Sequence, residues 1–317
     1  MTPDASKPTA KPVDYLLLLG LATLWGASYS LIKVGVETIP PITFIAARTV
    51  IAGALLLAIM RLRGIAMPRD PTTWRRFLFQ ALMNSVLPFT LIAWAEQTID
   101  AGLAAILNSM TPIFTFLLTW LLMRPEPARL RKLVGVTMGF AGVTLIVGVG
   151  ALGGVGRNVL AELAVIAATV CYAGAAIFGR KFSSLSPLAP AAGSLICGAV
   201  VLVPLSLILD RPWTLSPSAE SLGALVGLAV CSTALAFVIF FRLVRTLGSV
   251  GTTAQAYLRA PIGVAIGVVT LGEQLAWSSG VGLLLVLAGV AAMTAQRLPS
   301  IRSLRSCRQP ETIPAKQ

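Results

Sequence analysis

The chain has 317 residues, of which 56% are apolar and 12% are charged, and its mean hydropathy is +0.85. So few charges cannot cover the surface of a water-soluble domain, which makes lipid the solvent for most of the chain. The formal charge of +13 does not indicate a nucleic-acid partner, because the basic residues are dispersed in short segments between apolar runs. The sequence contains no histidine, which excludes imidazole metal sites and histidine proton relays, and we expect neither a metal nor a cofactor.

A polar, proline-rich segment comes first, at residues 1–13, and we expect it to be a cytoplasmic leader. Ten apolar segments follow, each near the length of about 20 residues that crosses about 30 Å of hydrocarbon as a helix. A basic tail closes the chain at residues 296–317. The fold class predicted is an all-α integral membrane protein with ten transmembrane helices. The predicted spans are residues 14–32, 42–60, 77–95, 101–123, 133–150, 160–178, 190–209, 222–241, 251–271 and 277–295.

The positions of the basic residues indicate the orientation of these spans. With the N-terminus in the cytoplasm, three of the 25 basic residues fall on the outer side, namely Lys33, Arg157 and Arg211. Two more, Arg48 and Arg259, fall inside spans, which leaves 20 of the 25 on the cytoplasmic side. Cytoplasmic loops of membrane proteins carry this excess of Lys and Arg. We therefore predict a multi-pass protein of the bacterial inner membrane with both termini in the cytoplasm.

The two halves of the chain are similar in sequence. WGASYSLIKVGVETIP at residues 25–40 aligns with YAGAAIFGRKFSSLSP at residues 172–187, and GLAAILNSMTPI at residues 102–113 aligns with GTTAQAYLRAPI at residues 251–262. The alignment defines two repeats of five spans each. It pairs Trp25 with Tyr172, Asn108 with Tyr257, Pro112 with Pro261, Glu126 with Glu273, Gly135 with Gly282, and Gly142 with Gly289.

The two repeats, at residues 14–150 and 151–295, are predicted to be inverted, because a repeat of five spans makes the next repeat enter from the opposite side. Inverted repeats are typical of secondary transporters, whose substrate site lies near the membrane midplane where the halves meet. Pro112 and Pro261 interrupt the fourth and ninth spans at matching positions, so we expect helix breaks there, next to the substrate site. Duplication without transport is the alternative.

Several motifs resemble the EamA type of the drug/metabolite transporter superfamily. They are a W-G-x-S-Y start at Trp25, an arginine in the second span, and the block VTLGEQLAWSSGVGLLLVLAGV at residues 269–290. The resemblance covers residues 14–295 and implies two EamA repeats of five helices in a carrier of small metabolites, often an exporter. The first repeat departs from the pattern, because MRPEPARLRK at residues 123–132 replaces the usual L-G-E turn.

Arg259 lies eight residues into the ninth predicted span. That position is about 12 Å deep, where a charge costs roughly 2.5–3.5 kcal/mol. No acidic residue lies in the interior of a predicted span, so an ion-pair partner is not evident. In one interpretation, Arg259 faces an aqueous cavity and binds an anionic group of the substrate, such as a carboxylate. In the other, it ties the interrupted helix to backbone carbonyls or to cytoplasmic phosphates.

Arg48 lies inside the second span, about 10 Å from the outer surface. We favour a structural role, with Glu37, Glu96 or Asp100 near the outer helix ends as its partners.

Aromatic and amide side chains near mid-depth are predicted to line the substrate cavity, because Trp and Tyr that anchor a helix lie at the interfaces instead. Tyr29 lies one turn after Trp25 on the same helix face. An amide at this depth, such as Asn108, needs a cavity or another helix. The predicted substrate-binding residues are Trp25, Tyr29, Arg48, Asn108, Tyr172, Tyr257 and Arg259.

Charged residues at helix junctions have other predicted roles. Lys33 is expected to anchor its helix at the interface, and Glu126 and Glu273 are expected to cap or pair at repeat-related turns. A proton site has no candidate at mid-depth, which leaves Glu37, Glu96 and Asp100 near the outer helix ends.

The sequence therefore predicts a secondary transporter that moves an amino acid, an organic acid or a related compound by alternating access. Its partners are the small-molecule substrate and membrane lipids, and a homodimer is left open. A passive facilitator and a membrane scaffold or sensor without flux are the alternatives. An enzyme would need a nucleophile with a base, or paired carboxylates, at depth, so we predict no enzymatic activity. No G-x-x-x-x-G-K-[ST] motif is present, so ATP hydrolysis is not expected to drive transport.

Overall fold

The computed structural model describes most of the helical part of the chain, in which every regular element is a helix. The predicted tail, nearly all of the predicted leader and most of the predicted span at residues 133–150 lie outside the described residues. The described residues are 12–123, 157–182, 184–246, 255–274 and 277–294, together with short stretches between 134 and 145.

The helices follow in chain order, and η1 and η4 continue directly from the helices that flank them. Their bounds are α1 (Pro12–Gly35), α2 (Pro41–Leu62), α3 (Pro71–Ala81), the π-helical η1 (Leu82–Val86), α4 (Leu87–Ala95), α5 (Ala101–Asn108), α6 (Thr111–Met123), α8 (Arg157–Gly179), the 3₁₀ turn η2 (Arg180–Phe182), α9 (Leu188–Leu209), the 3₁₀ turn η3 (Pro212–Thr214), α10 (Ala219–Ala229), the π-helical η4 (Val230–Leu235), α11 (Ala236–Thr246), α13 (Gln255–Leu271) and α14 (Trp277–Thr294).

Seven helical segments in the described part of the chain are long and apolar enough to cross a membrane, and each coincides with one of the ten predicted spans. The apolar stretches of α13 and α14, Pro261–Leu271 and Gly280–Gly289, are shorter. These two helices coincide with the ninth and tenth predicted spans. The seven segments are Pro12–Gly35, Pro41–Leu62, Pro71–Ala95, Ala101–Leu121, Val159–Phe178, Leu188–Leu209 and Ala219–Phe240.

Local sequence signals fix the ends of several helices. α3 begins at Pro71, directly after Asp70, whose carboxylate accepts a hydrogen bond from the Thr73 amide nitrogen at 2.7 Å. This is the combination of N-cap acid and first-turn proline that starts helices, because the acid satisfies a free N–H and proline needs none. α2 ends before Gly64, whose φ of +66° lies in the left-handed region that favours glycine.

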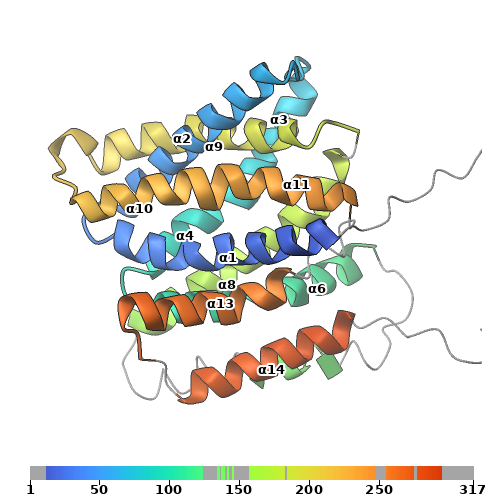
Figure 1. Cartoon of the computed structure of the whole chain (residues 1–317), viewed down its shortest axis with the longest axis vertical. Helices are drawn as coiled ribbons and strands as arrows, with labels where there is room; N and C mark the ends of the chain where they lie inside the picture. Colours follow the sequence, from blue (N-terminus) through green and yellow to red (C-terminus); the bar gives the residue numbers. More distant parts are fainter. Residues whose placement is uncertain are drawn as a thin grey trace, which may run out of the picture.

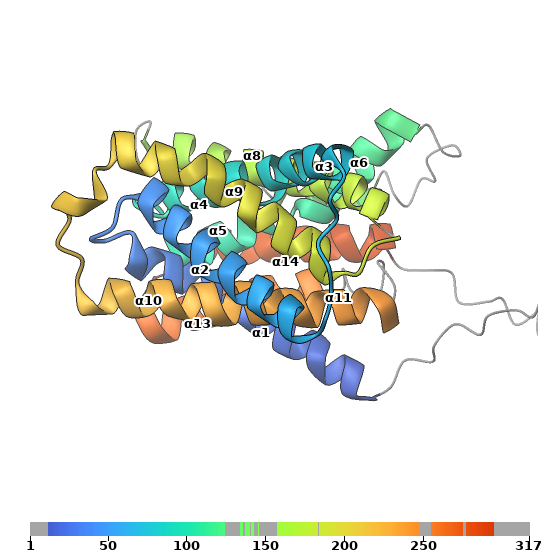
Figure 2. The same ribbon diagram turned by 90° about the horizontal axis from the view of Figure 1, so that it is seen from above.

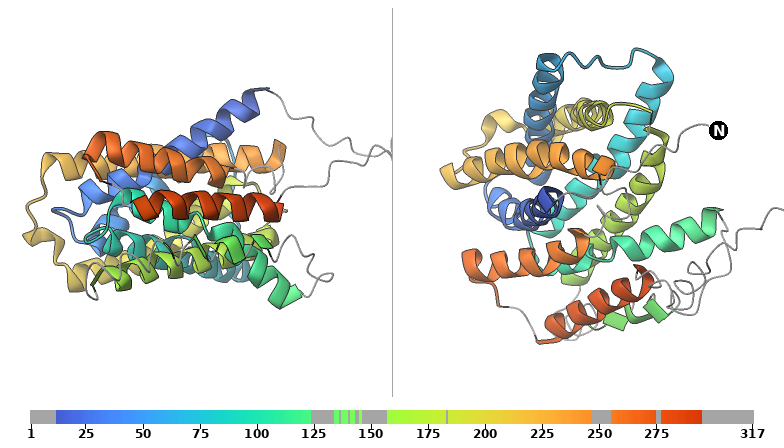
Figure 3. Two further views of the ribbon diagram at one scale, coloured as in Figure 1. Left: turned by 90° about the horizontal axis from the view of Figure 1, so that it is seen from below. Right: turned by 45° about the vertical axis from the view of Figure 1, so that its right-hand side comes forward.

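The long axes of the helices run in similar directions, and α1 lies between α11 and α13 (Figure 1). It packs against α13, α10, α11 and α5. α2 packs against α9, and α4 packs against α8. Seen from above, α8 and α9 lie on one side and α10 and α13 on the other (Figure 2). α14 lies at one edge of the bundle (Figure 3).

The crossing of α1 and α13 is close because two glycines meet there. A Cβ atom on Gly26 would lie 3.1 Å from the Gly263 backbone nitrogen and 3.2 Å from the Arg259 carbonyl oxygen. Small residues allow helix backbones to approach in this way, and the resulting van der Waals contact holds helices together in lipid. The crossing therefore places the backbone of Arg259 directly against α1.

Two π-helical segments interrupt helices at matching positions of the two halves. η1 begins at residue 82 and η4 begins at residue 230, 148 residues later. At the same spacing, Ser85 of η1 corresponds to Thr233 of η4, and both are buried. Short π-helical segments inside α-helices frequently mark functional sites.

Candidate functional site

Five of the seven predicted substrate-binding residues lie together in the interior, and we call them the polar cluster. They come from five helices: Tyr29 from α1, Arg48 from α2, Asn108 from α5, Tyr172 from α8 and Arg259 from α13. The hydroxyls of Tyr29 and Tyr172 lie within electrostatic range of each other and of both arginines. The cluster therefore joins side chains from both halves of the chain.

A hydrogen bond between Asn108 and Tyr29 forms the centre of the polar cluster. Asn108 Nδ2 donates to the Tyr29 hydroxyl, and Asn108 Oδ1 accepts from Thr111 Oγ1 at 3.1 Å. Asn108 is 2% exposed and Tyr29 is 3% exposed. The amide is held at the point where α5 ends and α6 begins, next to Pro112. The phenol accepts this hydrogen bond and keeps its own O–H for a further acceptor.

Arg48 is buried and is held by the other half of the chain. Its Nε donates to Thr233 Oγ1 at 2.8 Å, and Thr233 Oγ1 donates to the Leu228 carbonyl oxygen at 2.8 Å. The guanidinium carbon lies 3.8 Å from the centre of the Phe89 ring, which is a cation–π contact. The carboxylates expected as partners, Glu37, Glu96 and Asp100, form no ion pair with Arg48 in the described part of the chain. The hydroxyl on the π-helical segment η4 takes that role.

Arg259 is half-buried, and fewer described groups contact its guanidinium than contact that of Arg48. Its Nε is buried and has no hydrogen-bond partner among the described residues. The nearest turn of α1 presents Gly26, which has no side chain to offer. A buried guanidinium donor without an acceptor is costly unless water or a ligand supplies one.

Lys33 and Glu273 hold the turns next to the cluster, where α4 ends and α5 begins. Lys33 Nζ donates to the carbonyl oxygens of Glu96 and Ile99, both at 2.8 Å, in the turn between α4 and α5. The Glu273 carboxylate accepts from the amide nitrogens of Ala101 and Gly102, at 2.7 and 2.9 Å. Glu273 thereby caps the N-terminus of α5, as carboxylates do where free N–H groups and the helix dipole meet. Its repeat mate Glu126 lies outside the described residues.

Glu96, one residue beyond α4, has a different environment. It is fully buried, and neither carboxylate oxygen has a hydrogen-bond partner among the described residues. Burial raises the pKa of the Glu96 carboxyl well above its ordinary value. The positive charge of Lys33 lowers this pKa, the negative charge of Glu273 raises it, and the positive charge of Arg48 lowers it.

The remaining predicted residues lie elsewhere or outside the described part of the chain. The Trp25 ring packs on Phe237 and Phe240 of α11, with ring centres 6.5 and 5.5 Å apart, because α1 contacts different helices at successive turns. The Tyr257 and Pro112 side chains lie outside what the structure describes. α13 continues through Pro261, because a membrane helix tolerates the loss of one backbone donor.

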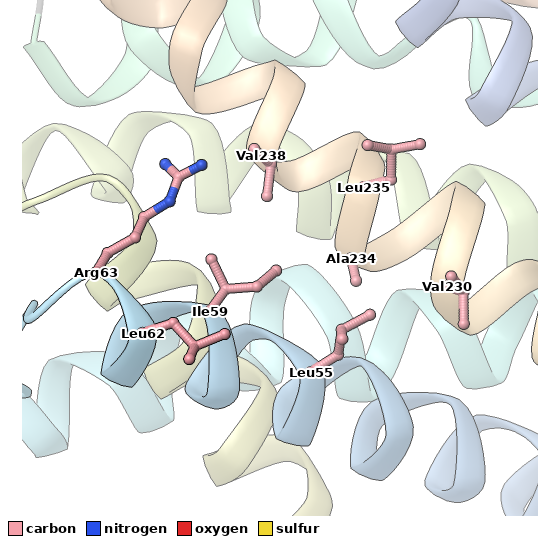
Figure 4. Close-up of a pocket in the computed structure, with 8 residues that line it drawn as sticks. All are labelled: Leu55, Ile59, Leu62, Arg63, Val230, Ala234, Leu235 and Val238. Atoms are coloured by element: carbon pink, nitrogen blue, oxygen red, sulfur yellow. The ribbon is translucent and has the colours of Figure 1, made fainter.

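A groove of about 450 Å³ lies away from the polar cluster (Figure 4). Residues of α2 form one wall, and residues of η4 and α11 form the other. Arg63 lies at one end, where a second hollow continues toward Arg242. The lining is almost entirely aliphatic, which suits lipid chains better than a polar solute. The eight lining residues are Leu55, Ile59, Leu62, Arg63, Val230, Ala234, Leu235 and Val238.

Thr233, the residue that holds Arg48, was not among the residues predicted from the sequence. A hydroxyl residue in an apolar span is common, so Thr233 alone gives no signal. The signal that was available is its alignment with Ser85 in the other repeat, which places a buried hydroxyl at the same depth in each half.

Two segments of the chain, residues 13–148 and 159–295, match the model of the EamA-like transporter family. The uncharacterized inner membrane transporter YedA of Escherichia coli K12 is 26% identical over 279 residues, which cover 87% of this chain and 89% of that protein. The uncharacterized transporter YvbV of Bacillus subtilis is 29% identical over 290 residues, or 90% and 92% of the two chains. A solved crystal structure superposes with a TM-score of 0.65 at 19% identity and covers 90% of this chain and 99% of its own. At that identity, the likeness concerns the fold alone.

Proposed function

Because the chain belongs to the EamA-like transporter family, we propose that it is a secondary transporter that carries a small metabolite across the inner membrane by alternating access. It is a multi-pass membrane protein with several apolar helices, and its relatives include an inner membrane transporter. Membership in a transporter family argues for transport rather than catalysis. Both termini lie in the cytoplasm in this proposal, as the loop charges favour.

The proposed architecture is ten helices in two inverted repeats, at residues 14–150 and 151–295. Reciprocal contacts between repeat mates support it. A Cβ on Gly142 would lie 2.7 Å from the Gly282 carbonyl oxygen, and one on Gly289 would lie 2.5 Å from the Gly135 carbonyl oxygen. Since Gly135 aligns with Gly282 and Gly142 with Gly289, exchanging the two halves maps this pair of contacts onto itself. A two-fold relation between the halves produces that pattern.

The observation that carries the proposal is the polar cluster, which lies where the two halves meet. Tyr29 and Asn108 come from the first half, and Tyr172 and Arg259 come from the second. Buried polar residues in a membrane protein are costly and are kept for substrate or ion pathways. Secondary transporters bind their substrates at this interface between the repeats.

The chemistry of the cluster favours a substrate with an anionic group. Arg259 offers a buried N–H that has no acceptor among the described residues, and the nearby Tyr29 O–H donates to none of them. Arginine forms paired hydrogen bonds with a carboxylate, and these charge-assisted bonds are stronger than neutral ones. An amino acid or an organic acid fits these donors. The aromatic ring of Tyr172 adds an apolar surface for the rest of the molecule.

Alternating access requires contacts between the halves that can break and reform. The hydrogen bond from Arg48 to Thr233 is such a contact, since it joins α2 of the first half to η4 of the second. Its acceptor lies on a π-helical segment, an irregularity that frequently occurs at functional sites. In the proposed cycle, rocking of the halves changes this contact while the substrate stays near the midplane.

The test is counterflow in proteoliposomes with labelled amino acids, organic acids and neutral metabolites. We expect saturable exchange of a carboxylate-bearing solute, and a loss of about 100-fold in kcat/KM, or about 2.7 kcal/mol, in the Arg259→Gln variant. The matched control is Arg63→Gln, which removes an exposed arginine outside the polar cluster and should leave exchange unchanged.

Both variants must first elute as folded protein. Folded wild-type protein that exchanges no solute contradicts the proposed transport function and favours a scaffold or sensor. Full exchange by Arg259→Gln contradicts the substrate site.

A further inference from the structure

Glu96 is a buried acid that the proposed substrate site does not use. Of the three acids that the sequence offers as possible proton sites, Glu37 and Asp100 are exposed, whereas Glu96 is fully buried. Both of its carboxylate oxygens lack a hydrogen-bond partner among the described residues. In such a position the desolvation penalty of a carboxylate is large, and that of the protonated acid is much smaller. Burial at this position therefore favours the protonated form of Glu96 over the carboxylate.

Charged and titratable groups face Glu96 from the elements packed around it. Lys33 and Tyr29 come from α1, Arg48 comes from α2, and Glu273 follows α13. Lys33 and Glu273 are each committed to backbone groups, through two hydrogen bonds in each case. Arg48 is committed to Thr233. These three charged groups are thus already engaged, and within the described residues neither cation forms an ion pair with the Glu96 carboxyl group.

We propose that Glu96 is the proton-binding site that couples solute movement to proton movement in this protein. This inference rests on the transport function proposed above. The described conformation corresponds to the protonated state, in which the neutral acid needs no counter-ion. Release of the proton to one side of the membrane leaves a carboxylate that attracts Lys33 and Arg48.

The Arg48–Thr233 hydrogen bond can couple the protonation state of Glu96 to the contact between the two halves. A carboxylate at Glu96 competes with Thr233 for the Arg48 guanidinium, because a charged acceptor forms a stronger hydrogen bond than a hydroxyl. Loss of the proton therefore weakens a contact between the two halves, and rebinding of the proton restores it. Tyr29 lies within electrostatic range of Glu96 and belongs to the polar cluster, so the state of Glu96 also changes the field at the substrate site.

The exposed acids Glu37 and Asp100 do not meet the requirements of a proton-coupling site, because they are not shielded from solvent. Glu37 and Asp100 are exposed in this conformation, so solvent reaches them without any movement of the halves. A coupling site must instead hold its proton away from solvent while the halves move. Glu96 is the acid among these three that meets this condition.

The experiment uses proteoliposomes and the carboxylate-bearing solute identified by the counterflow screen, with pyranine trapped inside as a pH indicator. In wild-type protein we expect the solute to move protons and a pH gradient to drive its accumulation. In Glu96→Gln we expect accumulation to fall by about tenfold or more and the pyranine response to vanish, while counterflow at equal pH persists within about twofold. Glu37→Gln, an exposed acid near the same membrane surface, is the matched control and should retain coupling.

Several results overturn the proposal. One is wild-type counterflow without any proton movement, and another is undiminished accumulation in folded Glu96→Gln. If wild-type protein shows no counterflow at all, the transport function fails first, which distinguishes the two hypotheses.

A measurement without substrate covers the case in which Glu96→Gln does not fold. Infrared spectra of protein in detergent at about pH 6, with Glu96 selectively labelled, should contain a protonated carboxyl band from that residue, whereas an ordinary Glu is ionised at that pH. The label is needed because Glu162 is also buried and its Oε2 also lacks a hydrogen-bond partner among the described residues. Glu96→Asp, which keeps the carboxyl, should retain the band and the coupling. The proposal is wrong if selective labelling shows that Glu96 is ionised at that pH.

Discussion

Arg48 and Arg259 both lie within predicted membrane spans, but the groups around their guanidinium groups differ. Arg48 is 4% exposed, donates to Thr233 and lies over the Phe89 ring. Arg259 is half-buried, and its Nε has no partner among the described residues. The neighbouring helix explains the difference, because α2 faces a hydroxyl on η4, whereas α13 faces Gly26. The fold supplies an acceptor for Arg48, whereas none of the described residues supplies one for Arg259 Nε.

Thr233→Val would break this comparison most directly, because it removes the acceptor of Arg48 and leaves a buried charged donor unpaired. We expect the free energy of unfolding to fall by about 1.5–3 kcal/mol. Thermal unfolding in detergent measures the change. Thr233→Ser keeps the hydroxyl and should stay close to wild type. Equal stability of the Val and Ser variants would show that the hydrogen bond to Arg48 contributes nothing.

Gly26→Val tests the surroundings of Arg259, where the absence of a side chain on Gly26 allows α1 and α13 to approach closely. The new side chain would meet the Gly263 backbone and the Arg259 carbonyl oxygen. We expect a loss of about 1–3 kcal/mol in stability, because overpacking forces the backbone to shift.

Gly20→Val is the matched control for this prediction. It lies on the same helix, and a Cβ there meets nothing within 4 Å. Similar unfolding temperatures for the two variants would contradict a close crossing at Gly26.

Tyr29→Phe sharpens the comparison within the polar cluster. The change removes the acceptor of Asn108 Nδ2 and leaves a buried amide donor unsatisfied, so we expect a loss of about 1 kcal/mol. Tyr172→Phe removes a phenol for which no hydrogen bond to a described residue is found, and it should cost less. Thermal unfolding of both variants measures the difference, and the reverse order would contradict the assignment.

Asp70→Ala provides the smallest effect, at a site remote from both arginines. The hydrogen bonds from Thr73 hold the pKa of Asp70 below its ordinary value of 3.8. A lowered pKa means that the carboxylate stabilises the folded state above pH 3.8, and that this contribution is lost as the pH falls through the folded-state pKa. The difference in unfolding temperature between variant and wild type should therefore be present at neutral pH and shrink in acid. A difference that does not change with pH would show that the charge plays no part.

Helix positions could be predicted from the sequence because lipid enforces a simple rule. A chain in hydrocarbon must satisfy its backbone hydrogen bonds within each segment, so an apolar run of sufficient length becomes a helix. The seven segments long and apolar enough to cross a membrane all coincide with predicted spans. The interruption next to Pro112 lies where the fourth span was expected to break, between α5 and α6.

The partners of the buried polar groups could not be predicted in the same way. Thr233 is 185 residues from Arg48, and no local pattern links the two. Trp25 and Tyr29 are one turn apart on α1 but contact different helices, α11 and α5. The helix break predicted at Pro261 is also absent. Proline removes one backbone donor, but α13 continues through this residue.

The sequence by itself determined the membrane environment, the family resemblance and the pairing of the two repeats, because composition, span length and offset are one-dimensional properties. Only the tertiary structure decided which arginine is satisfied, that Glu273 caps α5, and that Glu96 is buried with no hydrogen-bond partner in the described part of the chain. These outcomes depend on which helix faces which, and packing among many helices sets that arrangement. In lipid, close contact and a few polar interactions hold the helices together, so the decisive pairs lie far apart in the chain.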